Sequence, residues 1–172
     1  MEINIPEEVQ VSLDSGSEIT ISGPNGEVSK EFDYPGLTIE LEDGKVSVNH
    51  PSSRKKDKAV VGSFSSHIEN AMKGVQEGFE YKLKIVYAHF PINVKVEGDY
   101  VVIENFLGEA HHRKAKIIPP TEVEVEEEEI YVRGPDKDAV GQTASNIEKT
   151  TQIKGKDPRR FQDGIYITSK GD

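Results

Sequence analysis

The sequence contains no cysteine, which excludes disulfide bonds and thiolate metal sites and agrees with a reducing cytosol. It has no apolar run of roughly 18 residues or more, so we expect no membrane-spanning helix. The first residues, Met1-Glu2-Ile3-Asn4-Ile5, lack the charged and then apolar arrangement of a signal peptide, and export is not expected. These absences together predict a cytoplasmic protein.

Motifs for nucleotide binding and catalysis are also missing. Neither Gly-x-x-x-x-Gly-Lys-Ser/Thr nor Gly-x-Gly-x-x-Gly occurs, and no serine lies within Gly-x-Ser-x-Gly. The five histidines show no His-x-x-x-His or His-Glu-x-x-His spacing. The acidic run from Glu122 to Glu129 contains Val123 and Val125 at alternate positions, which indicates a strand entering a turn and not a calcium loop. We therefore expect no enzyme, no cofactor, no metal site and no small-molecule substrate.

The net charge of −10 argues at first against a nucleic-acid partner, because Lys and Arg drive phosphate binding. The charge is unevenly distributed, however. Residues 1–82 hold 8 Lys/Arg and 15 Asp/Glu, whereas residues 83–172 hold 13 Lys/Arg and 16 Asp/Glu. Six of those 16 acids lie between Glu122 and Glu129, so the rest of the second half is basic. Since a partner responds to charges within about one Debye length, a local basic patch can still bind RNA.

An internal duplication is the most informative feature of the sequence. Residues 61–69 align with residues 140–148 at a spacing of 79, and five of the nine positions are identical. Residues 5–11 similarly align with residues 90–96, and residues 41–48 with residues 125–132. A period near 80 is too long for a solenoid repeat and indicates two copies of one small domain.

Each copy is predicted to consist of strands followed by one helix. Apolar residues alternate with polar ones from residue 9 to 13, 19 to 21, 37 to 41 and 46 to 48, which is typical of half-buried strands. The second copy repeats this pattern at 94–96, 101–103, 123–125 and 130–132. Steps of three and four residues then predict helices, marked by Val61, Phe64, Ile68, Met72 and Val75 and by Val140, Thr143 and Ile147.

We predict an α+β fold in which each copy has an antiparallel sheet covered by its helix. The copies are assigned to residues 1–82 and 83–172, joined near a strand over residues 79–90 on which Tyr81, Leu83, Ile85 and Tyr87 share one face. Gly78 is expected to end the first helix.

The segment after the second helix has no counterpart in the first copy, and it carries a cluster of cations. Lys154, Lys156, Arg159 and Arg160 lie within seven residues, next to Phe161. Such a loop can follow phosphates while an aromatic ring or guanidinium plane stacks on an unpaired base. The same pattern also fits a solvated loop whose Phe161 is packed into the domain core.

Two further basic clusters are weaker candidates. His111-His112-Arg113-Lys114-Ala115-Lys116 fits either an RNA contact or a solvated hairpin rim. Arg54-Lys55-Lys56-Asp57-Lys58 precedes the first helix, where we favour solvated side chains.

Five blocks of residues extend in order over most of the chain: Gly62–Asn70 (GSFSSHIEN), Gly74–Tyr81 (GVQEGFEY), Tyr87–Pro91 (YAHFP), Val102–Glu109 (VIENFLGE) and Arg160–Ile167 (RFQDGIYI). Together these blocks resemble the archaeal and eukaryotic form of the ribosomal protein L-six family of the large subunit. The resemblance implies a duplicated α+β fold, in agreement with the repeat. It also implies a structural role in the cytoplasmic ribosome, near the translation-factor binding region, the sarcin–ricin loop and the base of the stalk.

The resemblance further implies contact with large-subunit ribosomal RNA through the second domain and C-terminal segment, with neighbouring ribosomal proteins, including stalk-base proteins, as partners. Transferred to matching positions, it nominates a set of RNA-binding residues, with the last two as weaker candidates: Lys154, Lys156, Arg159, Arg160, Phe161, Gln162, Arg113 and Lys114. The alternative is a non-ribosomal, acidic, β-rich scaffold that binds proteins, whose complexes would respond little to added salt.

Overall fold

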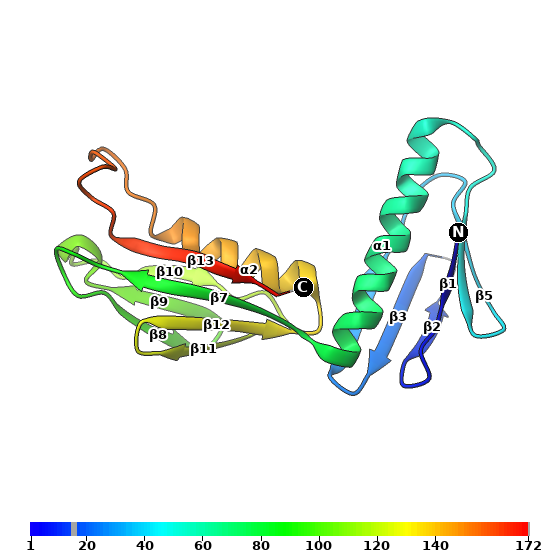
Figure 1. Cartoon of the computed structure of the whole chain (residues 1–172), viewed down its shortest axis with the longest axis horizontal. Helices are drawn as coiled ribbons and strands as arrows, with labels where there is room; N and C mark the ends of the chain where they lie inside the picture. Colours follow the sequence, from blue (N-terminus) through cyan, green and yellow to red (C-terminus); the bar gives the residue numbers. More distant parts are fainter. Residues whose placement is uncertain (15–16, 172) are drawn as a thin grey trace. The chain divides into compact units, whose positions relative to one another are not determined.

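The alternating segments form strands and the three-and-four-residue stripes form helices in the computed structural model, which describes residues 1–14 and 17–171. The chain divides into two units, Met1–Gly78 and Phe79–Asp172, and each contains antiparallel sheets and one long helix (Figure 1). The predicted α+β class and the duplication are confirmed. The boundary precedes the expected one at residues 82–83, because all of β7 (Phe79–Val86) pairs with strands of the second unit.

The first unit contains two three-stranded antiparallel sheets, in the orders β1-β6-β5 and β2-β3-β4, rather than the single sheet expected. The helix α1 packs on strands of both sheets. The elements are β1 (Glu2–Asn4), β2 (Gln10–Asp14), β3 (Glu18–Gly23), β4 (Gly26–Glu31), β5 (Thr38–Glu42), β6 (Lys45–Asn49) and α1 (Lys55–Glu77).

The apolar stripe of α1 lies in the core of the first unit, as predicted. Ile68, Met72 and Val75 are buried, and Val61 and Phe64 pack at the edge of the same cluster. The helix ends at Gly78, as expected: the φ of Gly78 is 77°, and its amide donates to the carbonyl of Gly74 at 2.8 Å. A positive φ of this kind favours glycine, because a Cβ would crowd the backbone.

The second unit also contains two sheets, in the orders β10-β9-β8 and β11-β12-β7-β13. The helix α2 packs on β7, β10, β12 and β13, and the predicted residues Val140, Thr143 and Ile147 are fully buried. The remaining elements are β8 (Asn93–Glu97), β9 (Tyr100–Glu104), the short 3-10 turn Phe106–Gly108, β10 (Arg113–Lys116), β11 (Glu122–Glu126), β12 (Glu129–Gly134), α2 (Lys137–Thr150) and β13 (Gly164–Lys170).

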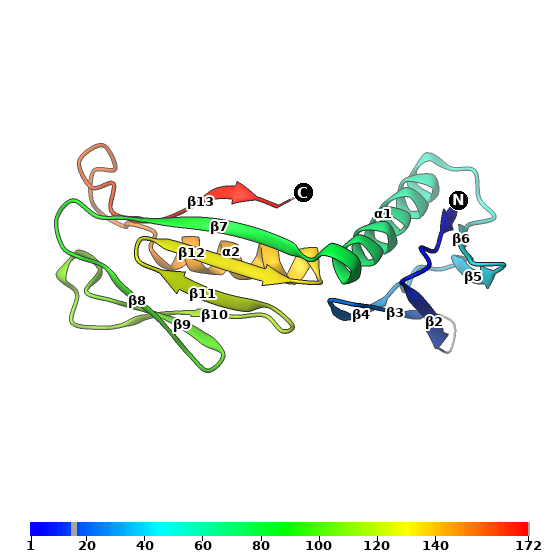
Figure 2. The ribbon, with the colours of Figure 1, turned by 60° about the horizontal axis from the view of Figure 1, so that its bottom comes forward.

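The two units share their topology except for one strand. In the first unit β6 lies between β1 and β5, and in the second β12 lies between β7 and β11. The second unit adds β13, which pairs with the free edge of β7 and was not predicted as a strand (Figure 2). The face shared by Tyr81, Leu83 and Ile85 is confirmed, but β7 ends at Val86 and Tyr87 is exposed. Within the described residues, neither α1 nor α2 has the length and apolar character of a membrane-spanning helix.

Candidate nucleic-acid interface

The basic segment identified in the sequence forms a loop between α2 and β13, which we call the tail loop (residues 152–163). Figure 1 shows it extending past the start of β13 at one end of the second unit's sheet. All four cations of the loop are exposed, and so is Gln162: the five residues are Lys154, Lys156, Arg159, Arg160 and Gln162. The structure therefore brings the main predicted residues together on one solvent-facing loop.

Phe161 is half-buried and organises the loop instead of joining the apolar core. Its ring stacks on the imidazole of His89, with the centroids 4.8 Å apart and the planes 21° from parallel. The ammonium of Lys156 lies 4.8 Å from the centroid of the same phenylalanine ring. A cation over an aromatic face is attracted by the ring quadrupole, so Lys156 is positioned without losing its charge.

Asp163 fixes the loop where it joins β13. Its buried carboxylate accepts a hydrogen bond from the His89 ring at 2.8 Å, and from the backbone amides of Ala88 and His89 at 3.3 and 3.2 Å. Burial opposes ionisation of this carboxyl, but the hydrogen bonds from His89 and the Ala88 amide outweigh it, so the pKa of Asp163 lies below its ordinary value. The charged form of Asp163 therefore attaches the loop to the segment after β7.

His89 and Asp163 were not among the predicted site residues. In the sequence His89 is one of five histidines without metal-ligand spacing, and Asp163 lies next to the cationic cluster without belonging to it. The two are separated by 74 positions, so no local period connects them. Their only common signal is that each lies inside a block that carries the family resemblance.

A turn centred on Asp157 shapes the cationic part of the loop. The Asp157 carbonyl accepts from the amides of Arg160 and Phe161 at 3.1 and 3.0 Å, and its carboxylate accepts from the Arg159 amide at 3.0 Å. Further along, the Tyr166 hydroxyl donates to the carbonyl of Gln162 at 2.7 Å. The cationic side chains thus project from a hydrogen-bonded backbone.

Arg113 lies apart from the free cations, because its guanidinium is bonded within the chain. It forms a two-point contact with the Glu109 carboxylate at 2.8 and 2.6 Å, and donates to the carbonyls of Thr150 and Gln152 at 2.7 and 3.2 Å. It also stacks 4.5 Å from the ring centroid of Phe106. Four of the five N–H donors of an arginine are thereby used, and Arg113 connects β10 to the start of the tail loop.

Lys114 has the opposite orientation. Successive side chains on a strand point to opposite faces, so Lys114 and Lys116 point outward while Ala115 is buried. Both lysines are exposed, and neither forms an ion pair with the residues that the structure describes. Lys114 is therefore available to a partner in a way that Arg113 is not.

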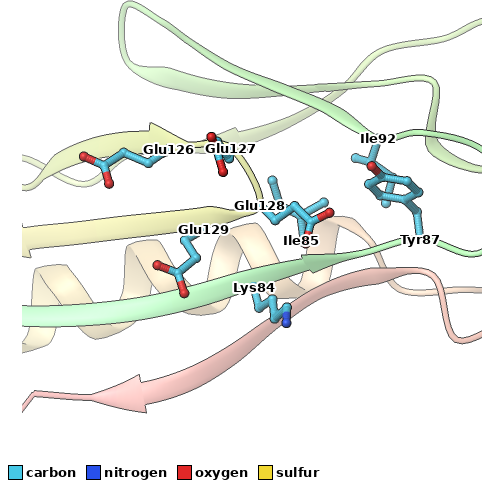
Figure 3. Close-up of a pocket in the computed structure, with 8 residues that line it drawn as sticks. All are labelled: Lys84, Ile85, Tyr87, Ile92, Glu126, Glu127, Glu128 and Glu129. Atoms are coloured by element: carbon cyan, nitrogen blue, oxygen red, sulfur yellow. The ribbon is translucent and has the colours of Figure 1, made fainter.

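The acidic run lies on the other flank of the same sheet end. The predicted strand and turn are confirmed, with Glu127 and Glu128 between β11 and β12. Both β12 and β13 run antiparallel to β7, so the acidic turn before β12 and the tail loop before β13 lie on opposite sides of β7. Figure 3 shows the hollow beside the acidic turn, lined by Lys84, Ile85, Tyr87, Ile92, Glu126, Glu127, Glu128 and Glu129. These four carboxylates disfavour phosphate there.

The remaining candidates form no further site. Across residues 1–14 and 17–171 no group of three or more His, Asp and Glu side chains is arranged to hold a metal ion. At the start of α1 the cations are exposed, while Asp57 is buried and accepts from the Tyr34 hydroxyl at 2.8 Å. The hydrogen bonds from Ser52 and Tyr34 hold the pKa of Asp57 below its ordinary value. This contact fixes the loop that precedes the helix.

The sequence matches a protein family in both halves. The family model described as "Ribosomal protein L6" matches residues 5–78 and residues 90–164, which are the two copies of the repeat. Large ribosomal subunit protein uL6 of Archaeoglobus fulgidus is 53% identical over 172 residues, covering 98% of this chain and 88% of that protein. The protein of the same name from Methanosarcina mazei is 56% identical over 168 residues, covering 98% and 95%.

A third relative, large ribosomal subunit protein uL6 of Methanobrevibacter smithii, is 50% identical over 169 residues, covering 98% of this chain and 94% of its own. The matches confirm the resemblance seen in the sequence. The relatives are archaeal ribosomal proteins and not enzymes. The chain therefore belongs to the ribosomal protein L6 family.

Proposed function

We propose that this protein is a constituent of the cytoplasmic large ribosomal subunit and binds ribosomal RNA chiefly through the tail loop. The observation that carries the proposal is the exposure of four cations on a loop whose base is held by Phe161, His89 and Asp163. Such a loop neutralises phosphates without first having to fold, and each neutralised phosphate releases counterions. Family membership supplies the ribosomal context.

The predicted RNA-binding residues take different parts in this proposal. Lys154, Lys156, Arg159 and Arg160 contact phosphates, and the exposed Gln162 side chain offers both donors and an acceptor. Phe161 is half-buried against His89, and the part of its ring that stays exposed contacts a base or a sugar. Lys114 adds a contact outside the loop, and Arg113 positions the start of the loop through its bonds to Thr150 and Gln152.

We further propose that the protein lies near the translation-factor binding region, beside the sarcin–ricin loop and the base of the stalk, with stalk-base proteins among its neighbours. The support is the family resemblance. The carboxylates of residues 126–129 form an acidic surface on the side of β7 opposite the tail loop. We propose that this surface contacts basic neighbouring proteins, because it repels phosphate and attracts cations.

Charge reversal at the tip of the loop tests the proposal. Arg159→Glu combined with Arg160→Glu is expected to abolish incorporation into large subunits, measured by sucrose-gradient fractionation of cells that express the tagged protein. Both side chains are exposed, so the purified variant should unfold at the same urea concentration as the unmodified protein. Lys45→Glu with Lys82→Glu is the matched control, because it changes the net charge equally on residues already paired with glutamates.

Normal sedimentation of the Arg159/Arg160 variant with large subunits would contradict the assignment of the loop. Sedimentation of the unmodified protein apart from ribosomes would contradict the function itself.

A further inference from the structure

The strand β10 has one edge that is not paired with another strand. It pairs with β9, and its opposite edge faces α2. Side chains of α2 cross the gap: Asn146 donates through Nδ2 to the Lys116 carbonyl at 3.0 Å, and the Thr143 hydroxyl accepts from the Ile118 amide at 3.0 Å. The edge and the helix are thus held together by side chains, which leaves a groove between them.

The groove is lined by cationic and polar residues from both elements. We call it the lysine groove, and its lining consists of Lys114, Ala115, Lys116, Asn146, Lys149 and Thr150. Lys114 and Lys116 are two positions apart on one face of a strand, which separates their Cα atoms by about 7 Å. Asn146, Lys149 and Thr150 are spaced three and four residues apart, so they share one face of α2.

The lysines of this groove carry uncompensated charge. No acidic residue lines the groove, and none of its three lysines forms an ion pair with a residue in the described part of the chain. Other lysines of the same unit are neutralised: Lys82 pairs with Glu80 and Lys95 with Glu97 and Glu104. Three cations around one groove that has no acidic lining residue form a local basic patch in a chain of net charge −10.

A purely structural role explains only part of this cluster. Lys149 lies in the last turn of α2, where a cation interacts favourably with the helix dipole. Lys114 and Lys116 lie on a strand, where no such dipole is present. Their repulsion of each other and of Lys149 is not offset by an ion pair with any residue that the structure describes, so an anionic ligand is the simplest reason for the arrangement.

The backbone of β10 adds neutral donors to the same groove. The Lys116 carbonyl and the Ile118 amide point toward α2, and residues two apart on a strand direct their backbone groups to the same edge. The amides of Lys114 and Lys116 therefore also face the helix side. Ammonium groups together with backbone amides are the donors that bind phosphate oxygens.

We propose that the lysine groove is a second RNA-binding site that takes the phosphodiester backbone, continuous with the tail loop. Thr150 lines the groove, and Arg113 bonds to the carbonyls of both Thr150 and Gln152, so the end of the groove adjoins the first residue of the loop. One strand of RNA can then pass from the loop onto β10. This inference rests on the proposed function, because both sites take the same RNA.

The test is the salt dependence of RNA binding by the full chain. The variant is Lys114→Gln/Lys116→Gln/Lys149→Gln, and the probe is deproteinised ribosomal RNA extracted from the large subunits of the source cells. Each phosphate contact contributes about 0.7 to the slope of log affinity against log salt, so three contacts predict a slope shallower by about 2. Affinity should be about 100-fold weaker at 0.1 M salt and converge with that of the unmodified protein near 1 M.

The matched control is Lys45→Gln/Lys82→Gln/Lys95→Gln, which removes the same charge from lysines that are already ion-paired. It should leave the slope unchanged. An unchanged slope for the groove variant, with binding still weakened by Arg159→Glu/Arg160→Glu, would overturn the groove while leaving the proposed function intact. If neither the groove variant nor Arg159→Glu/Arg160→Glu alters RNA binding, both the groove and the proposed function are contradicted.

Discussion

The attachment of the tail loop through Asp163 gives the most direct test of how the fold presents its cations. Asp163→Ala removes a carboxylate that accepts hydrogen bonds from the His89 ring and from the amides of Ala88 and His89. The amide contacts are long, at 3.2 and 3.3 Å, and the His89 side chain is one-third exposed, so water can replace part of what is lost.

Removing the acceptor from a buried donor costs about 1–3 kcal/mol, and more when the acceptor is charged. Taking the lower end for all three donors, we expect Asp163→Ala to reduce the free energy of unfolding of the second unit by about 3–4 kcal/mol. Asp163→Asn retains one acceptor and the shape, and about 1–2 kcal/mol should be lost. In the Asp163→Ala variant the backbone of the loop becomes freer, and RNA binding must then order it again. Ordering one residue costs about 1–2 kcal/mol, which corresponds to roughly tenfold weaker RNA affinity.

The assay is urea unfolding followed by tyrosine fluorescence. Tyr34 belongs to the first unit and the other five tyrosines to the second, so the signal reports chiefly on the unit that holds the loop. Asp99→Ala is the matched control, since Asp99 is exposed in the turn between β8 and β9. If Asp163→Ala unfolded at the same urea concentration as Asp99→Ala, the anchoring role would be refuted.

The stability that Asp163 contributes to the second unit depends on pH in a defined direction. The folded pKa of Asp163 lies below the value of an unfolded aspartate, which is about 4. The stabilisation is therefore present above about pH 4 and is lost as the pH falls below that value through the folded pKa. The Asp163→Asn variant should lose this part of the acid sensitivity, measured as urea midpoints between about pH 3 and 6.

Two further predictions concern residues outside the loop. Arg113→Gln removes the charge and the two-point contact with Glu109, so it should destabilise the second unit by about 1–3 kcal/mol in urea while leaving the salt slope of RNA binding unchanged; a shallower slope would show direct phosphate contact. The hydrogen bond from Tyr131 to Glu129 raises the pKa of Tyr131 to about 12. Absorbance titration should find Tyr131 still protonated above pH 11, and Glu129→Gln should return its pKa toward 10, whereas an unchanged titration would exclude this cause.

The helices and most strands were predictable because each has apolar residues at a regular spacing, which places them all on the face that packs on the core. Ile68, Met72 and Val75 illustrate this on α1. The strand β13 was not predicted, because the repeat offered no template for a segment absent from the first copy. Only Ile165 and Ile167 mark its buried face, which is too short a pattern to distinguish a strand from a tail.

In the candidate site, too, features set by neighbouring residues were predictable, and a contact between distant residues was not. The exposure of the loop cations followed from their clustering in the sequence, where Gly155 and Pro158 lie between them. The inward orientation of Arg113 could also have been predicted, since it shares its strand face with the buried Ala115 and Ile117. The contact between His89 and Asp163 could not, because tertiary packing alone brings together residues 74 positions apart.

The position of β13 after the tail loop has a consequence for synthesis of the protein. A growing chain contains all four loop cations before it contains the strand that pairs with β7. Until β13 has left the exit tunnel, the loop lacks its second attachment and the edge of β7 stays open. The shaped cationic surface therefore forms only once β13 has paired with β7, and a chain that has not yet added β13 carries the same cations on a less firmly attached loop.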